Sequence, residues 1–245
     1  MTWALHTPRF WLVTVAALIV AGGTFLLGQW QMGRAAQKQA LQTAITAQSG
    51  LAALDNSAFD AMKNPPDAIH RPAQLSGVWQ TGHTVFLDNR PMSGKTGFFV
   101  VTPLALQGST QVILVQRGWV PRDFTSRTRL PDVSTPVGVV TVQGRIAPPP
   151  SKLYEFKGVE SGPIRQNMDV GAFAAETALP LSPVSLLQTG AASEGLLRDW
   201  VAPNLGVDKH YGYAFQWFAL CALATGLYVW FQLIVPLRVK NRVLP

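Results

Sequence analysis

Two charge-free apolar segments near the ends of the chain constrain its fold more than any other feature. Phe10–Gly33 and Tyr211–Leu237 contain no charged side chain, and each is long enough to cross a bilayer core of about 30 Å as a helix. Aromatic residues stand near the ends of both segments, where Trp and Tyr rings favour the headgroup region. The sequence therefore predicts two transmembrane helices, with residues 34–209 between them.

The first segment has one alternative interpretation, a cleaved signal peptide. Its apolar run exceeds the usual core of about 7–15 residues in such signals, and no clear small-x-small cleavage site precedes a polar mature end. We therefore expect it to be retained as a membrane anchor. Small residues would then let the two helices approach closely, namely Ala17, Ala21, Gly22 and Gly23.

The distribution of charge predicts the orientation in the membrane. All 13 acidic residues and 16 of the 20 basic residues lie between Arg34 and His210. The tails, residues 1–9 and 238–245, carry basic residues alone: Arg9, and then Arg238, Lys240 and Arg242. Under the positive-inside rule both tails are expected in the cytoplasm. The central domain is then periplasmic, in a multi-pass protein of a bacterial cytoplasmic membrane, and the short tails leave no room for a cytoplasmic output domain.

The central segment changes to a hydrophobic period of two, which is typical of strands. Runs rich in Val, Phe, Leu and Trp predict strands at Gln74–Trp79, Thr84–Asn89, Gly97–Leu106, Gln111–Val120, Val137–Ala147 and Val184–Gln188. Turn residues predict loops at Asp88–Pro91 with Ser93–Lys95 and at Gln107–Ser109, and a linker at Asn64–Asp67.

Two helical features complete the predicted fold. The first helix should continue outward to Ser49 and end at Gly50, and Asp169–Thr177 should form a short helix with Asp169 as its N-cap. The fold class is therefore two transmembrane helices flanking a mostly antiparallel β domain of α+β type. A barrel or a sandwich is expected, because a closed sheet hides its edges.

Composition and motifs exclude several functions. Charged residues make up 13% of the chain, about half the share of a soluble domain, and the basic excess does not form the clusters of a nucleic-acid binder. Gly94–Thr96 lacks the earlier glycine of a phosphate-binding loop. No G-x-S-x-G sequence is present, and the single Cys221 has no partner thiol. The His residues lack zinc-site spacing, so we expect His6, His70 and His83 to be solvated or hydrogen-bonded.

His210 differs from the other histidines because it stands at the start of the second apolar segment. At 100° per residue, its helix face is shared by Ala214, Trp217, Cys221, Tyr228 and Gln232. An imidazole above an aromatic, apolar face can ligate a haem iron at the lipid boundary, and polar groups at that depth tend to be functional. The alternative is an interfacial histidine that is simply hydrated at the headgroups.

Four motifs, in the same order along the chain, resemble the surfeit locus protein 1 family. They are Leu27–Gln31 with Arg34 and Lys38, a central block of two stretches, Leu87–Arg90 and Gly97–Leu104, the Arg-Gly-Trp-Val-Pro motif within Val115–Arg122, and His210–Phe218. The chain departs from the family pattern at Gln116 and Lys209, where the family has Asn, and residues 189–208 do not align. Together these motifs extend over both helices and most of the central domain.

The resemblance implies a non-enzymatic assembly factor for haem-copper, cytochrome c type terminal oxidase, which binds haem a and aids its insertion into the catalytic subunit. It implies His210 as the haem iron ligand, with Tyr213 and Trp217 beside it. Arg117, Trp119 and Arg122 would dock the oxidase or pair with haem propionates, or they form a buried Trp and a strand-end turn. Gly97 is expected to serve backbone geometry. Implied partners are the oxidase catalytic subunit, haem a synthase, other assembly factors and membrane lipid, with no nucleic acid.

Two other functions remain open at this point. The chain can be a scaffold that holds oxidase subunits without binding haem, or, more remotely, an extracytoplasmic membrane-anchored enzyme. The domain boundaries expected in either case are a tail at 1–9, helices at 10–33 and 210–237, a periplasmic domain at 34–209, and a tail at 238–245.

Overall fold

A computed structural model describes residues 7–123, 130–153, 161–200 and 206–238. The chain divides into two compact units. The helical unit combines Met1–Thr43 with Asn204–Pro245, and the β domain comprises Ala44–Pro203. Both ends of the chain therefore belong to one unit, although the whole β domain separates them in sequence.

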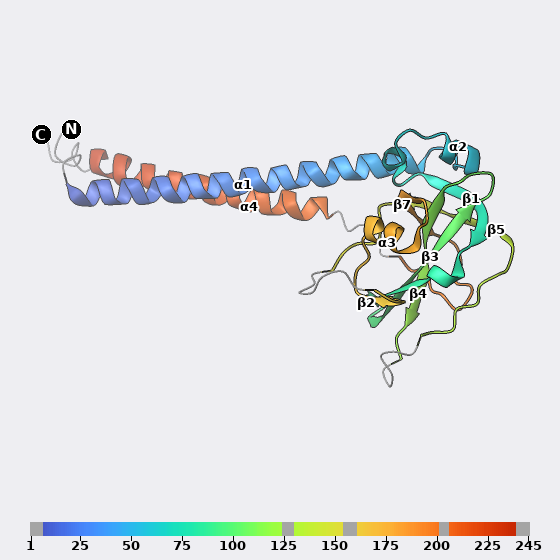
Figure 1. The fold of residues 1–245 in the computed structure, drawn as a ribbon. Coiled ribbons are helices and arrows are strands. Elements are labelled where there is room, and N and C mark those ends of the chain that lie inside the picture. The colour runs from blue at the N-terminus through green and yellow to red at the C-terminus, as the bar shows by residue number, and fades with distance from the viewer. Residues whose placement is uncertain (1–6, 124–129, 154–160, 201–205, 239–245) are drawn as a thin grey trace, which may run out of the picture. The chain divides into compact units, whose positions relative to one another are not determined.

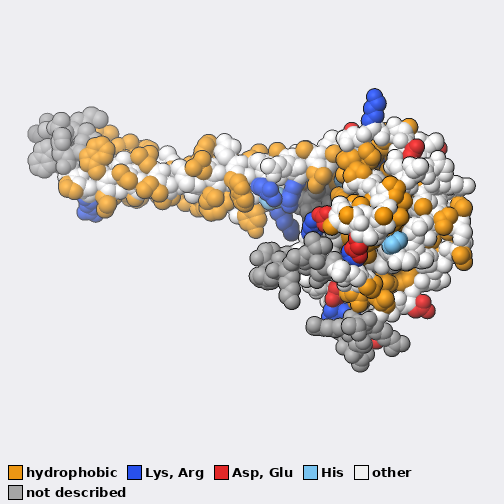
Figure 2. Space-filling model, in the orientation of Figure 1, with side chains coloured by type: hydrophobic (Ala, Val, Ile, Leu, Met, Phe, Trp, Pro, Cys, Tyr) orange, Lys and Arg blue, Asp and Glu red, His pale blue; other side chains and the backbone are white. Residues whose placement is uncertain are grey.

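Two long helices form the helical unit and run side by side in opposite directions (Figure 1). Helix α1 spans Pro8–Ser49, and α4 spans Val207–Tyr228 and continues through a π-helical turn, Val229–Ile234. Both helices are long and apolar enough to cross a membrane. Hydrophobic side chains cover most of the visible face of the pair, and basic side chains lie near its two ends (Figure 2). The predicted continuation of the first helix to Ser49 is confirmed.

The contact between α1 and α4 follows a heptad pattern. In the contact region of α1, buried and half-buried residues recur at alternating intervals of four and three, which is typical of left-handed coiled-coil packing: Phe10, Thr14, Ala17, Ala21, Thr24, Gly28, Gln31, Ala35 and Lys38. A Cβ added at Gly28 would lie 2.6 Å from the ring of Phe218. Small residues therefore set how closely the helices approach.

The small residues of α1 do not all contribute to this approach. The Cys221 thiol donates a hydrogen bond to the Ala21 carbonyl oxygen at 3.3 Å, so α4 reaches the α1 backbone there as expected. Gly22 and Gly23 do not contact α4, because nothing lies within 4 Å of a Cβ added at either position. The expectation that this glycine pair lies in the contact is wrong, since the heptad pattern places it outside.

A closed sheet forms the β domain. The strands are β1 (Pro72–Trp79), β2 (Val85–Met92), β3 (Lys95–Leu106), β4 (Val112–Pro121), β5 (Val139–Ala147), β6 (Ile164–Arg165) and β7 (Leu181–Gln188). The order is β1-β5-β7-β4-β3-β2-β6, and β1 also pairs with β3. This pairing closes five strands into a barrel, while β2 and β6 extend from β3. Only β4–β7 and β2–β6 are parallel among the described strands, so the predicted mostly antiparallel barrel class is confirmed.

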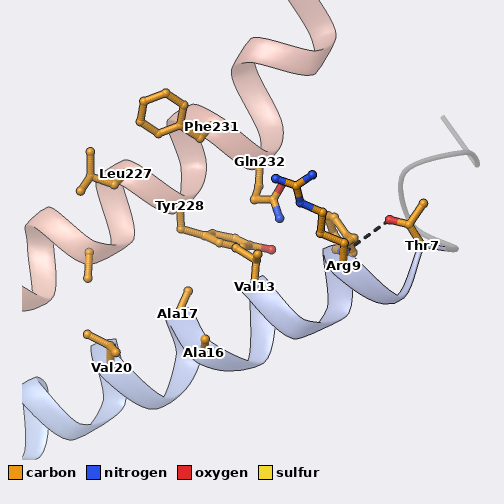
Figure 3. A pocket seen from close by; sticks show the side chains of 12 residues that line it. Thr7, Arg9, Val13, Ala16, Ala17, Val20, Leu227, Tyr228, Phe231 and Gln232 are labelled. Atoms are coloured by element: carbon orange, nitrogen blue, oxygen red, sulfur yellow. Dashed lines mark hydrogen bonds between the residues drawn. The ribbon is translucent and has the colours of Figure 1, made fainter.

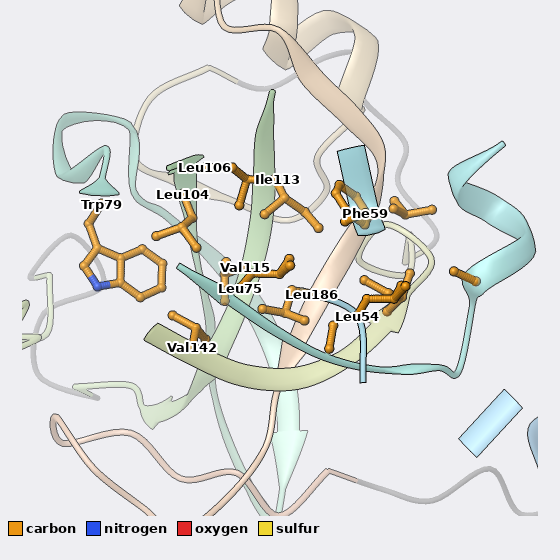
Figure 4. Packing of buried hydrophobic residues seen from close by; sticks show 14 residues of the cluster. Leu54, Phe59, Leu75, Trp79, Leu104, Leu106, Ile113, Val115, Val142 and Leu186 are labelled. Atoms are coloured by element: carbon orange, nitrogen blue, oxygen red, sulfur yellow. The ribbon is translucent and has the colours of Figure 1, made fainter. Parts of the chain in front are cut away.

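The barrel encloses the main hydrophobic core (Figure 4). Side chains of β1 alternate between core and surface, and Leu75 and Trp79 point inward. Leu104, Ile113 and Leu186 from three other strands are fully buried beside them. Burying a side chain of this size stabilises the fold by about 1.5–3 kcal/mol, so the core holds the closed sheet together.

Short helices flank the barrel, and the sequence predicted one of them. Helix α3 (Val170–Thr177) begins as predicted, with the Asp169 carboxylate accepting a hydrogen bond from the Ala172 N–H at 3.1 Å. Helix α2 (Asn56–Asp60) was not predicted, although Asp55 caps it in the same way and Phe59 is fully buried in the core. The linker predicted at Asn64–Asp67 is instead a 3-10 helix, Pro65–Ala68, because Pro fits the first turn of a helix.

The loop predicted at Asp88–Pro91 is also wrong, because β2 continues through it to Met92. The pairing of β2 with β3 is irregular between Leu87 and Arg90, where Asn89 has a positive φ of 61°. The turn itself is Ser93-Gly94, and both residues have positive φ, as the favoured two-residue hairpin turns require. The hairpin predicted at Gln107–Ser109 is confirmed, with Gly108 at φ 79°.

Candidate functional site

His210 lies in the first turn of α4 and is held by a residue of α1. Its Nδ1 lies 2.7 Å from Gln31 Oε1. An amide oxygen can only accept, so Nδ1 is the donor in this bond, and in the neutral imidazole Nε2 then keeps its lone pair. Among the described residues, Gln31 is the one hydrogen-bond partner of the ring. The imidazole is thus oriented on one side and able to act as a ligand on the other.

Aromatic and basic side chains surround this histidine. Tyr213, three residues after His210, is 53% exposed, and Trp217, two turns along the same face of the helix, is half-buried. The positive charges of Lys38 and Arg34, on the α1 turns that follow Gln31, act on the His210 ring through space. This end of the helical unit, the His210 end, therefore offers an imidazole nitrogen, aromatic rings and two cations.

The predicted helix face of His210 turns toward α1. Ala214 is 2% exposed, Cys221 bonds the Ala21 carbonyl, and the Tyr228 hydroxyl lies 3.0 Å from Thr14 Oγ1. The grouping of these residues on one face is confirmed, but α1 covers that face below the first turn. A ligand on His210 would therefore lie at the His210 end, beside Tyr213 and Trp217, rather than between the two helices.

Arg117 lies in the interior of the β domain. Val100 pairs with Gly118 and Val101 with Gln116, which leaves Arg117 as the extra residue of a β-bulge. Its side chain is fully buried and its guanidinium lies 4.7 Å from the Trp79 ring centroid. It donates to three oxygen acceptors, Thr135 Oγ1 at 2.8 Å, the Ser134 carbonyl at 3.0 Å and Glu194 Oε2 at 2.8 Å.

Trp119 is buried as well, and Arg122 is paired. The Trp119 ring is 2% exposed, and its N–H donates to the Arg90 carbonyl at 2.8 Å. A Cβ added at Gly97 would lie 2.6 Å from this ring, so Gly97 provides the space that the ring occupies. Arg122 is half-buried and contacts the Asp88 carboxylate at 3.2 Å. Arg117 and Trp119 therefore do not form a surface for docking or for propionates. The buried Trp of the structural alternative is confirmed, but its strand-end turn is wrong, because β4 continues to Pro121 and Arg117 lies at a bulge within it.

Residues 189–200, where the sequence shows no family motif, form a strap on β4. Trp119 and Leu197 exchange backbone hydrogen bonds of 2.7 and 2.8 Å, and the Arg198 side chain donates to the Arg117 carbonyl at 2.8 Å. A Cβ added at Gly118 would lie 2.7 Å from the Leu196 Cβ. The strap thus supplies the Glu194 carboxylate to Arg117 and fixes the backbone of the Arg-Gly-Trp motif.

The two described histidines of the β domain have ordinary surroundings. His70 Nδ1 lies 3.3 Å from Arg145 Nη1, and burial, followed by the positive charge of Arg145, lowers the pKa of His70 below its usual 6.5. His83 lines a hollow of about 280 Å³ beside Arg165 and Glu176. Those two side chains form a paired ion bridge of 2.6 and 2.8 Å. In the described part of the chain, no three His, Cys, Asp or Glu residues are grouped as metal ligands.

Sequence reasoning missed the partners of both key residues. Gln31 lies 179 positions from His210, and the available signal was a polar side chain at a heptad position of an apolar helix. Glu194 lies 77 positions from Arg117 in a Gly/Ala/Ser stretch without a recognisable pattern. A helical period can therefore identify a partner such as Gln31. A partner such as Glu194 cannot be identified in this way, because its position depends on the fold of a loop.

These features define a class of protein: two membrane-crossing helices that precede and follow a closed β domain in sequence, with an oriented histidine on the second helix. The comparison with protein-family models matches residues 18–222 to the SURF1 family, and the chain belongs to this family. Comparison with curated proteins gives no significant match. The match contains both Gln31 and His210. Membership is consistent with a role in cytochrome oxidase assembly, in a family of assembly factors that is not known as catalytic.

Proposed function

We propose that the protein is a non-enzymatic assembly factor that holds haem a at the membrane as cargo and passes it to the catalytic subunit of a haem-copper terminal oxidase. The observation that carries the proposal is the Gln31–His210 bond. A metal-ligating His almost always donates its other ring N–H to an oxygen acceptor, which fixes the tautomer and the ring orientation. Gln31 supplies that acceptor, and Nε2 of His210 supplies the ligand.

The surroundings of His210 suit an amphipathic, anionic cargo. Haem iron accepts an imidazole ligand, and the exposed ring of Tyr213 and the half-buried ring of Trp217 give an apolar surface on the same side of the helix. Arg34 and Lys38 would pair with the propionate carboxylates. A single protein ligand also suits a carrier, because cargo that must be transferred requires weak and exchangeable binding.

The proposal includes location and partners. The helical unit would lie in a bacterial cytoplasmic membrane, with the β domain on the periplasmic side and both tails in the cytoplasm. The oxidase catalytic subunit would receive the haem, and haem a synthase and other assembly factors would act beside the protein. The buried state of Arg117 and Trp119 leaves oxidase docking to other surfaces of the β domain.

Absorption spectroscopy on the full chain, purified from cells that make haem a, tests this function. We expect a bound-haem band in the wild type, its loss in His210→Ala, and a weaker band in Gln31→Leu, because changing an outer partner of a metal ligand typically costs about 10–100-fold in affinity. His83→Ala and Gln29→Leu are the matched controls and should keep the band. If the wild type shows no haem band, the carrier function is wrong. The remaining function is then a scaffold that holds oxidase subunits without binding haem.

A further inference from the structure

A groove opens between α1 and α4 at the end of the helical unit opposite His210 (Figure 3). We call it the Arg9 groove, because Arg9 stands at its mouth with Gln232 nearby. Its volume is about 660 Å³, within the range of about 300–1,000 Å³ that small-molecule sites occupy. Most of its lining lies outside residues 18–222, the part of the chain that matches the family.

Small side chains line this groove, and an irregular helix turn contributes Phe231 and Gln232 to it. Ala16 and Ala17 on α1 and Ala224 on α4 leave room where larger side chains would fill the contact. Pro236 has no N–H to donate to the Gln232 carbonyl, and its ring crowds that carbonyl. The helix adapts with a π turn in which the Val235 N–H reaches the Trp230 oxygen, five residues back. Such turns frequently occur at functional sites.

The walls of the groove are apolar and its mouth is cationic. Val13, Val20, Leu227 and Phe231 line the walls, and Phe231 is 61% exposed. The polar groups Arg9 and Gln232 lie together at one end (Figure 3). The Tyr228 hydroxyl, which is also in the groove, is already used in its bond of 3.0 Å with Thr14.

Arg9 has no acidic side chain as a partner among the described residues of the helical unit. No acidic residue occurs in the sequence before Asp55 or after Asp208. Asp208 is the one acid of this unit, and it lies in the first turn of α4, at the His210 end. In the described part of the chain, Arg9 forms no ion pair. Among the residues that the structure describes, the mouth of the groove therefore holds a cation with no paired anion.

We propose that the Arg9 groove binds one anionic phospholipid, with an acyl chain along Val13, Val20 and Leu227 and the phosphate at Arg9 and Gln232. Within a bilayer the acyl chain gains little from entering an apolar groove, because lipid tails are as apolar as Leu. Selectivity must therefore come from the headgroup. One interfacial cation favours an anionic lipid by about fivefold. A neutral transmembrane helix of another protein would leave Arg9 unpaired, so charge complementarity favours the lipid.

Native mass spectrometry of the delipidated full chain tests this site. The probes are phosphatidylglycerol and phosphatidylcholine with identical acyl chains, added separately and in competition. We expect one retained phosphatidylglycerol per chain, with a preference of about fivefold over phosphatidylcholine. Arg9→Gln should abolish the preference, and Ala17→Trp should abolish retention of both lipids because the new ring fills the groove.

Matched variants separate this site from general membrane effects. Lys209→Gln removes a positive charge at the His210 end, and Val15→Trp adds the same ring outside the groove lining, so both should behave as the wild type. Equal retention of the two lipids, or retention unchanged by Ala17→Trp, overturns the proposal. If Ala17→Trp instead releases a co-purified membrane protein while no lipid is retained by the wild type, the groove holds a helix and the lipid proposal is wrong.

Discussion

The fully buried guanidinium of Arg117 depends on one carboxylate. Glu194 supplies its ion pair at 2.8 Å, and the other acceptors are a hydroxyl and a carbonyl. A buried charge is costly unless it is paired, so removing one partner of such a pair destabilises a protein far more than removing a surface pair. The strap that carries Glu194 is therefore part of the folded core rather than a surface loop.

Glu194→Gln should destabilise the full chain by about 3 kcal/mol, because it leaves the Arg117 charge uncompensated. Denaturant unfolding in detergent, followed by Trp fluorescence, measures the change. Lys152→Gln is the control, since it breaks an ion pair with Asp169 in which both side chains are at least half exposed; it should change stability little. A Glu194→Gln variant as stable as this control would show that the hydroxyl and carbonyl acceptors suffice.

His70 should make stability depend on pH in a defined window. Burial and Arg145 hold its pKa below the unfolded value of 6.5, so the unfolded chain binds a proton first as the pH falls. The contribution of His70 is complete above about pH 6.5 and is lost progressively below it. Between pH 7.5 and 5.5, the wild type should lose more unfolding free energy than His70→Gln. Parallel stability curves for the two proteins would contradict this assignment.

At the scale of elements, the sequence predicts what depends on local pattern. The period of two along β1 and the Asp169 cap of α3 are visible in the sequence, and both elements form as predicted. Helix α2 has five residues, too few to establish a helical period, and it exists because Phe59 enters the core. The bulge at Arg117 depends on pairing with β3 and on the strap, so no local pattern reveals it.

In the candidate site too, one residue could be predicted from local sequence, but its pairing with a second could not. His210 could be found from its position at the start of an apolar helix, whereas its partner depends on the register of α1 against α4. That register is set by small residues, above all by Gly28, where a Cβ would collide with the Phe218 ring at 2.6 Å. A one-residue change in register would rotate Gln31 away from His210, so the packing of the pair also positions the imidazole.

Gly28→Leu should therefore separate the helices and lower the thermal stability of the full chain in detergent, because overpacking a close contact typically costs about 1–3 kcal/mol. It should also weaken haem retention through the loss of the Gln31–His210 bond. Gly22→Leu is the matched control, since nothing lies within 4 Å of a Cβ there, and it should behave as the wild type. Equal melting temperatures for the two variants would mean that the helices are not held by this contact.

At the scale of the whole molecule, charge and hydrophobicity divide the chain into two apolar segments suited to a membrane and a β domain suited to water. The low charged fraction of 13% reflects the two apolar segments without charge, Phe10–Gly33 in α1 and Tyr211–Leu237 in the second long helix. All acidic residues lie from Asp55 to Asp208, so both tails are purely basic. If both apolar helices cross the membrane, as their length and composition allow, the tails lie on one side and the β domain on the other.

Protease access should reveal which side holds the β domain. The positive-inside rule predicts that proteinase K, added to intact spheroplasts, cleaves the β domain but spares an epitope tag on either tail. The protected fragments should each contain one tag and one apolar helix. A soluble cytoplasmic protein in the same sample must stay intact, which confirms that the membrane is sealed. If the chain is fully protected in intact spheroplasts and is cleaved only after lysis, the orientation is the reverse of the one predicted. The His210 end would then lie on the cytoplasmic side, and the proposed delivery of haem would have to occur there.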